Sequence, residues 1–166
     1  MSQKPRRPTL QDVADLVGIT KMTVSRYLKD PALVSAAVQE KIAVALDTLG
    51  YIPNRAPDLL SNAKSKAIGV LLPSLTNQVF AEVIRGIESV TEPAGYQTML
   101  AHYGYSSDVE QERIASLLSY HVDGLILSES YHTERTLRMI QTAGIPVIEV
   151  MDSRSPVVEQ AVGFDN

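Results

Sequence analysis

The spacing of apolar residues changes near residue 66 of this chain. Before that point apolar residues recur three or four positions apart, a period that predicts amphipathic helices. Beyond it, short apolar runs alternate with segments of helical period, which predicts β–α–β units around a parallel sheet. We therefore expect a multidomain chain: a helical headpiece over residues 1–54, a hinge helix and linker over 55–66, and an α/β lobe over 67–166.

The stretch TLQDVADLVGITKMTVSRYL predicts two short helices joined by a tight turn. Thr9 is placed to cap the first helix, with Asp12 three residues on, close to a capping-box pattern. Gly18 supplies a residue that tolerates a left-handed turn, and Thr20 is placed to cap the second helix. With Val24 in its buried stripe, the second helix exposes a face that a helix-turn-helix places in the major groove of DNA. That face consists of Lys21, Met22, Thr23, Ser25 and Arg26.

A third helix is predicted to close the core of the headpiece. Ser35 is a plausible cap at its start, and Gly50 stands where a left-handed residue ends a helix. The apolar positions between them follow a helical period and are Val38, Ile42, Ala45, Leu46 and Leu49. We interpret these residues as structural, since they hold the second helix rigid.

Three blocks of the headpiece carry a family resemblance. They are TLQDVADLVGITKMTVSRYL, the VS at 34–35, and LGYIPNRA at 49–56. Their spacing resembles the amino-terminal domain of the lac-repressor (LacI) family, and residues 66–166 resemble that family's sugar-binding core. The run GVLLPSLTNQVFAEVIRGIESVTEPAGYQTMLAHYGY is similar to members that repress gluconate and idonate operons. The resemblance implies a transcriptional repressor that binds operator DNA as a homodimer or higher oligomer and is relieved by a gluconate-like sugar acid.

The resemblance also assigns DNA contacts. Lys21, Met22 and Arg26 match the family's base-contacting positions. Position and chemistry make seven residues candidates for phosphate contacts: Lys4, Arg7, Thr9, Thr23, Ser25, Tyr51 and Asn54. For the basic arm MSQKPRRP, phosphate contact by Lys4, Arg6 and Arg7 and a merely solvated terminus both remain open.

A short, marginal helix is predicted from Asn54 to about Asn62. The resemblance implies that it orders only on operator DNA, with Ala56 and Leu60 at the minor groove and Leu60 as a wedge that kinks the duplex. The alternative is that Leu59 and Leu60 pack onto the core. Pro57 departs from the family's usual small residue and disfavours helical angles at Ala56, so the helix is expected to start later or form less readily.

The lobe is expected to alternate strands and helices. The predicted strands are 67–73, 96–103, 123–130, 146–152 and one beginning at 161, and the predicted helices are 81–94, 109–120 and 133–143. The inward positions expected for the first helix are Val83, Ile84, Ile87 and Val90.

Ligands of parallel sheets bind beyond the carboxyl ends of the strands, where three loops are predicted here: 73–80, 128–132 and 152–155. Their hydroxyl, amide and carboxylate groups beside a ring suit a polyhydroxylated ligand. The resemblance places the effector at these loops, with Asn77, Phe80, Ser128 and Asp152 as contacts. The alternative is that Asn77 and Asp152 only cap loops.

The net charge of −4 conceals an asymmetry. Residues 1–66 hold 10 Lys or Arg and 6 Asp or Glu, giving +4, whereas residues 67–166 hold 5 Arg and 13 acids, giving −8. A basic headpiece on an acidic body directs the headpiece at phosphate. The chain has no cysteine, no apolar run long enough to cross a membrane and no secretory leader, so we expect a cytoplasmic protein without a cofactor.

Enzyme motifs are missing from the sequence, which contains no GxSxG, HExxH, Walker loop or GxGxxG. His102, His121 and His132 lack metal-ligand spacing. His102 and His132 are expected near strand ends, in reach of ligand or solvent, and His121 at the surface. The sequence therefore predicts that the protein is not an enzyme, and the alternative function is a sugar-binding module without a DNA role.

Regulation is expected to be incomplete in this chain, because its relatives continue past Asn166 into a second lobe that forms the other wall of the effector site. Half a site cannot exclude water around a polyol, so its polar contacts are worth little. We predict weak operator binding that gluconate does not release. Titration of gluconate into the operator complex tests this, and release at millimolar gluconate would contradict it.

Overall fold

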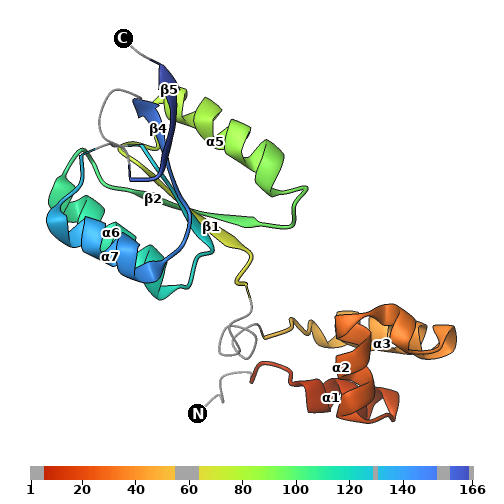
Figure 1. Cartoon of the computed structure of the whole chain (residues 1–166). Coiled ribbons are helices and arrows are strands. Elements are labelled where there is room, and N and C mark those ends of the chain that lie inside the picture. The colour runs from red at the N-terminus through yellow and green to blue at the C-terminus, as the bar shows by residue number, and fades with distance from the viewer. Residues whose placement is uncertain (1–5, 55–63, 129–130, 153–157, 165–166) are drawn as a thin grey trace, which may run out of the picture. The chain divides into compact units, whose positions relative to one another are not determined.

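The computed structural model of the chain describes residues 6–54, 64–128, 131–152 and 158–164 (Figure 1). The chain divides into two compact units, residues 1–55 and 56–166, which we call the headpiece and the lobe. The hinge contacts expected at Ala56 and Leu60 lie outside the described residues.

Helices make up the described headpiece: α1 (Leu10–Val17), α2 (Lys21–Lys29), the 3-10 turn η1 (Pro31–Leu33) and α3 (Ala36–Leu49). The predicted starts of α1 and α2 are confirmed, because the side chains of Thr9 and Thr20 accept backbone N–H groups three residues on. Gly18 (φ 77°) and Gly50 (φ 58°) end α1 and α3 in the left-handed conformation. The sequence pattern did not predict η1, which begins where the Asp30 carboxylate accepts a backbone N–H two residues on.

One face of each headpiece helix contributes to a small apolar core. Its buried members are Val13, Ala14, Val24, Ile42 and Ala45. Partly buried residues from all three α-helices pack against them, among them Leu10, Val17, Leu28, Val38 and Leu46. The predicted three-helix core is confirmed. Full burial of a valine such as Val24 stabilises by about 1.5–3 kcal/mol, and it fixes the rotation of α2 about its axis.

In the lobe, the described strands form one parallel sheet in the order β2-β1-β3-β4-β5. The strands are β1 (Ala67–Leu72), β2 (Gln97–His102), β3 (Gly124–Leu127), β4 (Val147–Asp152) and β5 (Gln160–Phe164). The helices that connect them are α5 (Gln78–Thr91), α6 (Ser107–Ser119) and α7 (Glu134–Ala143). The strand order reverses between β1 and β3, and ligands of such sheets bind outside the carboxyl ends of the strands at this switch point.

The lobe helices cover the two faces of the sheet unequally: α5 lies on one face, and α6 and α7 lie on the other (Figure 1). Alternate residues of each strand point to opposite faces. The core on the side of α6 and α7 includes Leu71, Ile114, Leu117, Leu125, Leu127, Ile140 and Val147. The smaller core on the side of α5 is built on Val70, Leu72 and Phe80.

A turn held by Asp123 leads the chain into β1. The Asp123 carboxylate accepts the backbone N–H groups of Ser65 (2.9 Å) and Lys66 (3.0 Å), and the Ser65 hydroxyl at 3.1 Å. Lys66 has a φ of 59°, and its ammonium lies 4.6 Å from the centre of the Tyr96 ring. The start of β1 is therefore anchored by a residue that lies just before β3.

Two helices begin earlier than the sequence pattern predicted. The helix predicted over 81–94 is α5, because the Asn77 side chain accepts the N–H of Val79 (3.1 Å) and starts the helix there. The helix predicted from 109 is α6, which begins two residues earlier because the Ser106 hydroxyl caps it. The inward position predicted for Val90 is wrong: its side chain is 71% exposed, beside an open groove described below.

Close packing between β1 and α6 generates a test of the fold. A Cβ at Gly69 would lie 2.8 Å from Leu125 Cδ2 and 3.1 Å from Leu117 Cδ1. Gly69→Ala should therefore lower the free energy of unfolding by about 1–3 kcal/mol through overpacking, measured by urea denaturation.

The matched control is Gly86→Ala, at an exposed position of α5 where a Cβ meets nothing within 4 Å. That change should stabilise by up to ~1 kcal/mol, the difference in helix propensity. If the two variants had equal urea midpoints, the packing of α6 on β1 would not require glycine at position 69.

Candidate functional site

The exposed face of α2 carries the predicted base-contacting residues. Lys21, Met22 and Arg26 are all exposed, and Met22 is 64% exposed. At 3.6 residues per turn these three side chains lie within an arc of about 140°. Val24 points away from that arc into the core. A thioether and two cations on one rigid face can contact base edges and methyl groups in a major groove.

The candidate phosphate contacts occupy different environments. Arg7, Thr9, Ser25 and Asn54 are exposed, whereas Thr23 and Tyr51 are half-buried. The Thr23 hydroxyl lies 3.0 Å from the Thr20 hydroxyl at the start of α2, and Tyr51 packs against the headpiece core. Lys4 lies outside the described residues. Because no nucleic acid is present, these assignments stay predictions.

An ion pair that sequence reasoning missed precedes α1. Arg6 Nη2 lies 3.0 and 3.2 Å from the two carboxylate oxygens of Asp12. The Thr9 side chain and backbone both donate to Asp12 Oδ2, each at 2.6 Å. These Thr9 hydrogen bonds, with help from the charge of Arg6, hold the pKa of Asp12 below its ordinary value. Arg6 and Arg7 are both exposed, and Arg6 is also paired with Asp12 of the headpiece.

The carboxyl edge of the sheet holds the predicted effector residues. Asn77 caps the start of α5, whereas the alternative left open by the sequence was that it caps a loop. Phe80 is buried against Val70 and Leu72. Ser128 is half-buried directly after β3, and its hydroxyl donates to the carbonyl of Leu71 in β1 (3.2 Å).

Ser128 and the loop carrying Asn77 therefore follow the two strands that flank the switch point. Asp152 ends β4, with its side chain outside the described set. The structure brings the loops after β1 and β3 to one edge, and the effector contacts themselves stay predictions.

A buried polar network lies behind this edge. His132 is 8% exposed, and Glu110 and Glu149 are each 1% exposed. His132 Nδ1 lies 2.9 Å from Glu110 Oε1, and Nε2 lies 2.9 Å from Glu149 Oε1. Burial favours the neutral ring, but the hydrogen bonds and charges of Glu110, and then of Glu149, outweigh it and raise the pKa of His132. His132 is thus near a strand end, as predicted, but is enclosed by protein rather than open to solvent.

Sequence reasoning did not find this network. The available signal was Glu149, a lone carboxylate inside the apolar strand sequence VIEVM, because an isolated charge in a buried strand requires a partner. His132 lies 17 residues from Glu149 and 22 residues from Glu110, so no local sequence pattern identifies these side chains as partners.

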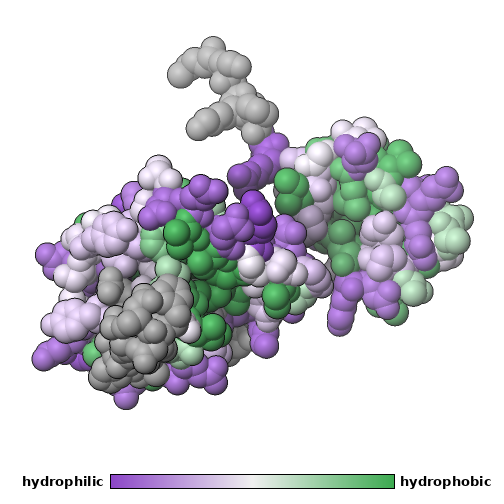
Figure 2. Space-filling model, turned by 90° about the horizontal axis from the view of Figure 1, so that it is seen from above, coloured by the Kyte–Doolittle hydropathy of each residue, from purple (hydrophilic) through white to green (hydrophobic). Residues whose placement is uncertain are grey.

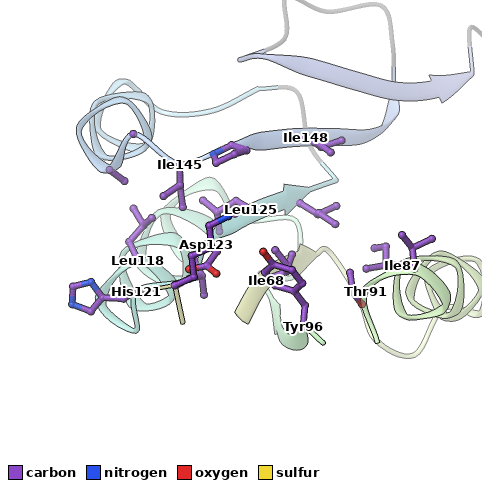
Figure 3. A pocket seen from close by; sticks show the side chains of 18 residues that line it. Ile68, Ile87, Thr91, Tyr96, Leu118, His121, Asp123, Leu125, Ile145 and Ile148 are labelled. Atoms are coloured by element: carbon purple, nitrogen blue, oxygen red, sulfur yellow. The ribbon is translucent and has the colours of Figure 1, made fainter. Parts of the chain in front are cut away.

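An open groove of about 1050 Å³ lies elsewhere on the lobe (Figure 3). Ile68, Ile87, Ile145 and Ile148 contribute to its mainly apolar lining. Residues that precede β3 and β4, such as Asp123, also line it, so the groove lies toward the amino ends of the strands. Figure 2 likewise shows a strip of hydrophobic surface on the lobe. Because of its position and apolar lining, we do not assign the polyol site to this groove.

Other kinds of site are missing from the described part of the chain. No group of three or more His, Asp or Glu side chains there is arranged to hold a metal ion. Of the described helices, none combines the length and the apolar composition that a membrane span requires.

Comparison with known families decides between the remaining interpretations. Residues 9–54 match the bacterial regulatory proteins of the lacI family, and residues 65–163 match the periplasmic binding proteins and sugar binding domain of the LacI family. The second match alone covers more than half of the chain. This chain belongs to the LacI family. The predicted fold class, a helix-turn-helix headpiece followed by a parallel-sheet lobe of the periplasmic-binding type, is confirmed.

Individual relatives resemble this LacI-family chain over nearly its whole length. The HTH-type transcriptional regulator GntR of Escherichia coli (strain K12) is 71% identical over 163 residues, which are 98% of this chain and 49% of that relative. The chain spans about half the length of the curated relatives it matches.

Solved structures of the family agree. A LacI-family transcriptional regulator from Silicibacter pomeroyi has a TM-score of 0.86 at 36% identity, covering 94% of this chain and 47% of that one. The lac repressor dimer bound to operator and the anti-inducer ONPF has a TM-score of 0.77 at 26% identity, covering 93% and 48% of the two chains.

Proposed function

We propose that this LacI-family chain belongs to a sequence-specific DNA-binding transcriptional regulator, a repressor of genes for the use of gluconate or related sugar acids. The observation that carries the proposal is the face of α2, where Lys21, Met22 and Arg26 are exposed together on a helix fixed by Val24. Relatives named as transcriptional regulators support it, and they give no reason to propose an enzymatic activity.

Charge supports the same function. The segment 1–66 carries +4 and the rest of the chain −8, so phosphate attracts the headpiece and repels the lobe. The positive end of α2, with its N-cap Thr20, also favours phosphate. A regulator of this kind acts where operator DNA is, in the cytoplasm.

For regulation, we propose that a sugar acid such as gluconate binds at the carboxyl edge, near Asn77, Phe80, Ser128 and Asp152. A homodimer is the proposed assembly, supported by similarity to the lac repressor dimer on operator. The minor-groove role of Leu60 belongs to the same proposal.

A gel shift tests the proposal. The upstream region of a gluconate-use operon should be retarded at lower protein concentrations than random DNA of equal length. Equal retardation of both would remove the sequence-specific role. No retardation of either would favour a sugar-binding module without a DNA role.

Arg26→Ala should cost about 1–3 kcal/mol on the specific site, the value of one bidentate contact to guanine. Binding to random DNA should change much less, because that binding depends on phosphates. Lys41→Ala, at an exposed position of α3, is the matched control and should leave the specificity ratio unchanged. Equal weakening of both DNAs by Arg26→Ala would mean that Arg26 contacts only phosphate.

Arg7→Ala should weaken binding to all sequences alike and lower the slope of log K against log salt by about one unit. Filter binding at several salt concentrations measures the slope. Arg113→Ala, an exposed position of the lobe, is the control and should leave the slope unchanged. An unchanged slope in Arg7→Ala would show that the basic arm does not touch DNA at this residue.

A further inference from the structure

The network of Glu110, His132 and Glu149 joins three elements that are distant in sequence. Glu110 lies in the first turn of α6, Glu149 lies in β4, and His132 directly precedes Thr133, the N-cap of α7. Both imidazole nitrogens are 2.9 Å from a carboxylate oxygen, and the three side chains are each at most 2% exposed.

The two carboxylate contacts favour the doubly protonated form of the His132 ring. A neutral imidazole has one N–H, so one of its nitrogens would direct a lone pair at a carboxylate oxygen. An imidazolium has two and donates to both Glu110 and Glu149. Those two carboxylates, one on α6 and one on β4, are the charged groups that act on the ring. Loss of the second proton would turn one attractive contact into a repulsive one.

Further hydrogen bonds extend from the network to the chain segments around it. Glu149 Oε2 accepts the backbone N–H of Val158 at 2.9 Å, so Glu149 also holds the segment that enters β5. Thr133, next to His132, donates to the side chain of Gln111, next to Glu110, at 2.8 Å. His132 and Thr133, which lead into α7, are thus both tied to α6, and Val158, which leads into β5, is tied to the same cluster.

Two predicted effector contacts lie close to these ties along the chain. Ser128 follows β3 and stands four residues before His132, and Asp152 ends β4, three residues after Glu149. We propose that His132 is a positioning residue for effector binding: held between Glu110 and Glu149, it fixes the approach to α7, on the side of Ser128, relative to β4, which ends at Asp152. This inference rests on the proposed function, in which the carboxyl edge receives a sugar acid.

Stability alone is a weak explanation of the network. A buried ion pair is often no more stable than apolar residues of the same volume. Here Glu110 Oε2 is buried without a hydrogen-bond partner among the described residues, an added cost. The charged cluster provides directional contacts, and these set one arrangement of α6, β4 and the residues before α7.

The test follows the His132 ring and the backbone amides of Ser128 and Val158 in the 166-residue chain. Nuclear magnetic resonance of the His132 ring should show both nitrogens mostly protonated at pH 6.5, where half of ordinary histidine rings are neutral. Protection factors of the Ser128 and Val158 amides, corrected for intrinsic exchange, should be high below about pH 6.5, the ordinary pKa of histidine. They should fall roughly tenfold as the pH rises through the raised pKa of His132, the loss expected for one hydrogen bond to a charged group.

Variants separate positioning from general destabilisation. Glu149→Gln keeps an acceptor of the same shape without the charge, so Val158 protection should already be low at pH 6 and should no longer follow the histidine. His132→Gln should abolish the pH step at both amides. The matched control is His102→Gln, an exposed histidine at the end of β2, which should keep the wild-type step.

Gluconate provides the second readout. Its dissociation constant, from resonance shifts at millimolar gluconate, should rise roughly tenfold over the same pH interval in the wild type and in His102→Gln, but not in His132→Gln. If gluconate shifts no resonance of the wild type, this half of the effector site does not bind the acid by itself, and the amide protection alone decides the positioning role. A His132 ring that is mostly neutral at pH 6.5, or protection at Ser128 and Val158 that is independent of pH and of His132→Gln, would overturn the inference.

Discussion

Burial of a single apolar face on each helix is the constraint on which both units of this chain depend. In the headpiece, Val24 and its neighbours bury one side of α2, and the opposite side is left with two cations and a methionine. A core this small gains little energy per residue, but it needs to specify only one rotation of one helix. The exposure of Lys21, Met22 and Arg26, on which the proposed DNA contacts depend, follows from that rotation and would be lost if α2 turned by half a turn.

The same constraint acts differently in the lobe, where helices cover the central strands β1, β3 and β4 on two faces. Parallel pairing brings the carboxyl ends of β1 and β3 together at the switch point, and this places Ser128 beside the carbonyl of Leu71. Polar groups inside such a sheet require internal partners, since water does not reach them. In the lobe, His132 is the partner of both Glu110 and Glu149. These contacts lie next to the loops where a sugar acid is proposed to bind.

Features fixed by near neighbours could be predicted from the sequence. Thr9, Thr20 and the two helix-ending glycines act within three or four residues, and the structure bears them out. The spacing of apolar residues likewise predicted the strands and the helices, because the apolar positions of each element are the ones that face the core. The start of α5 was missed, since Asn77 was assigned to ligand binding rather than to capping. The network around His132 was missed because its pairing depends on which elements the sheet places side by side.

The anchor that Asp123 provides has a consequence for dissecting the molecule. Among the described residues that lead into β1, Ser65 and Lys66 are held by the lobe, because the Asp123 carboxylate, just before β3, accepts both of their backbone N–H groups. Lys64 is exposed, so a protease that cleaves after lysine can reach it. The peptide bond after Lys66 joins it to Ala67, the first residue of β1. A lobe cut at Lys64 keeps all three donors to Asp123, and one cut two residues later loses them together. The natural boundary for an independent lobe therefore precedes the first strand.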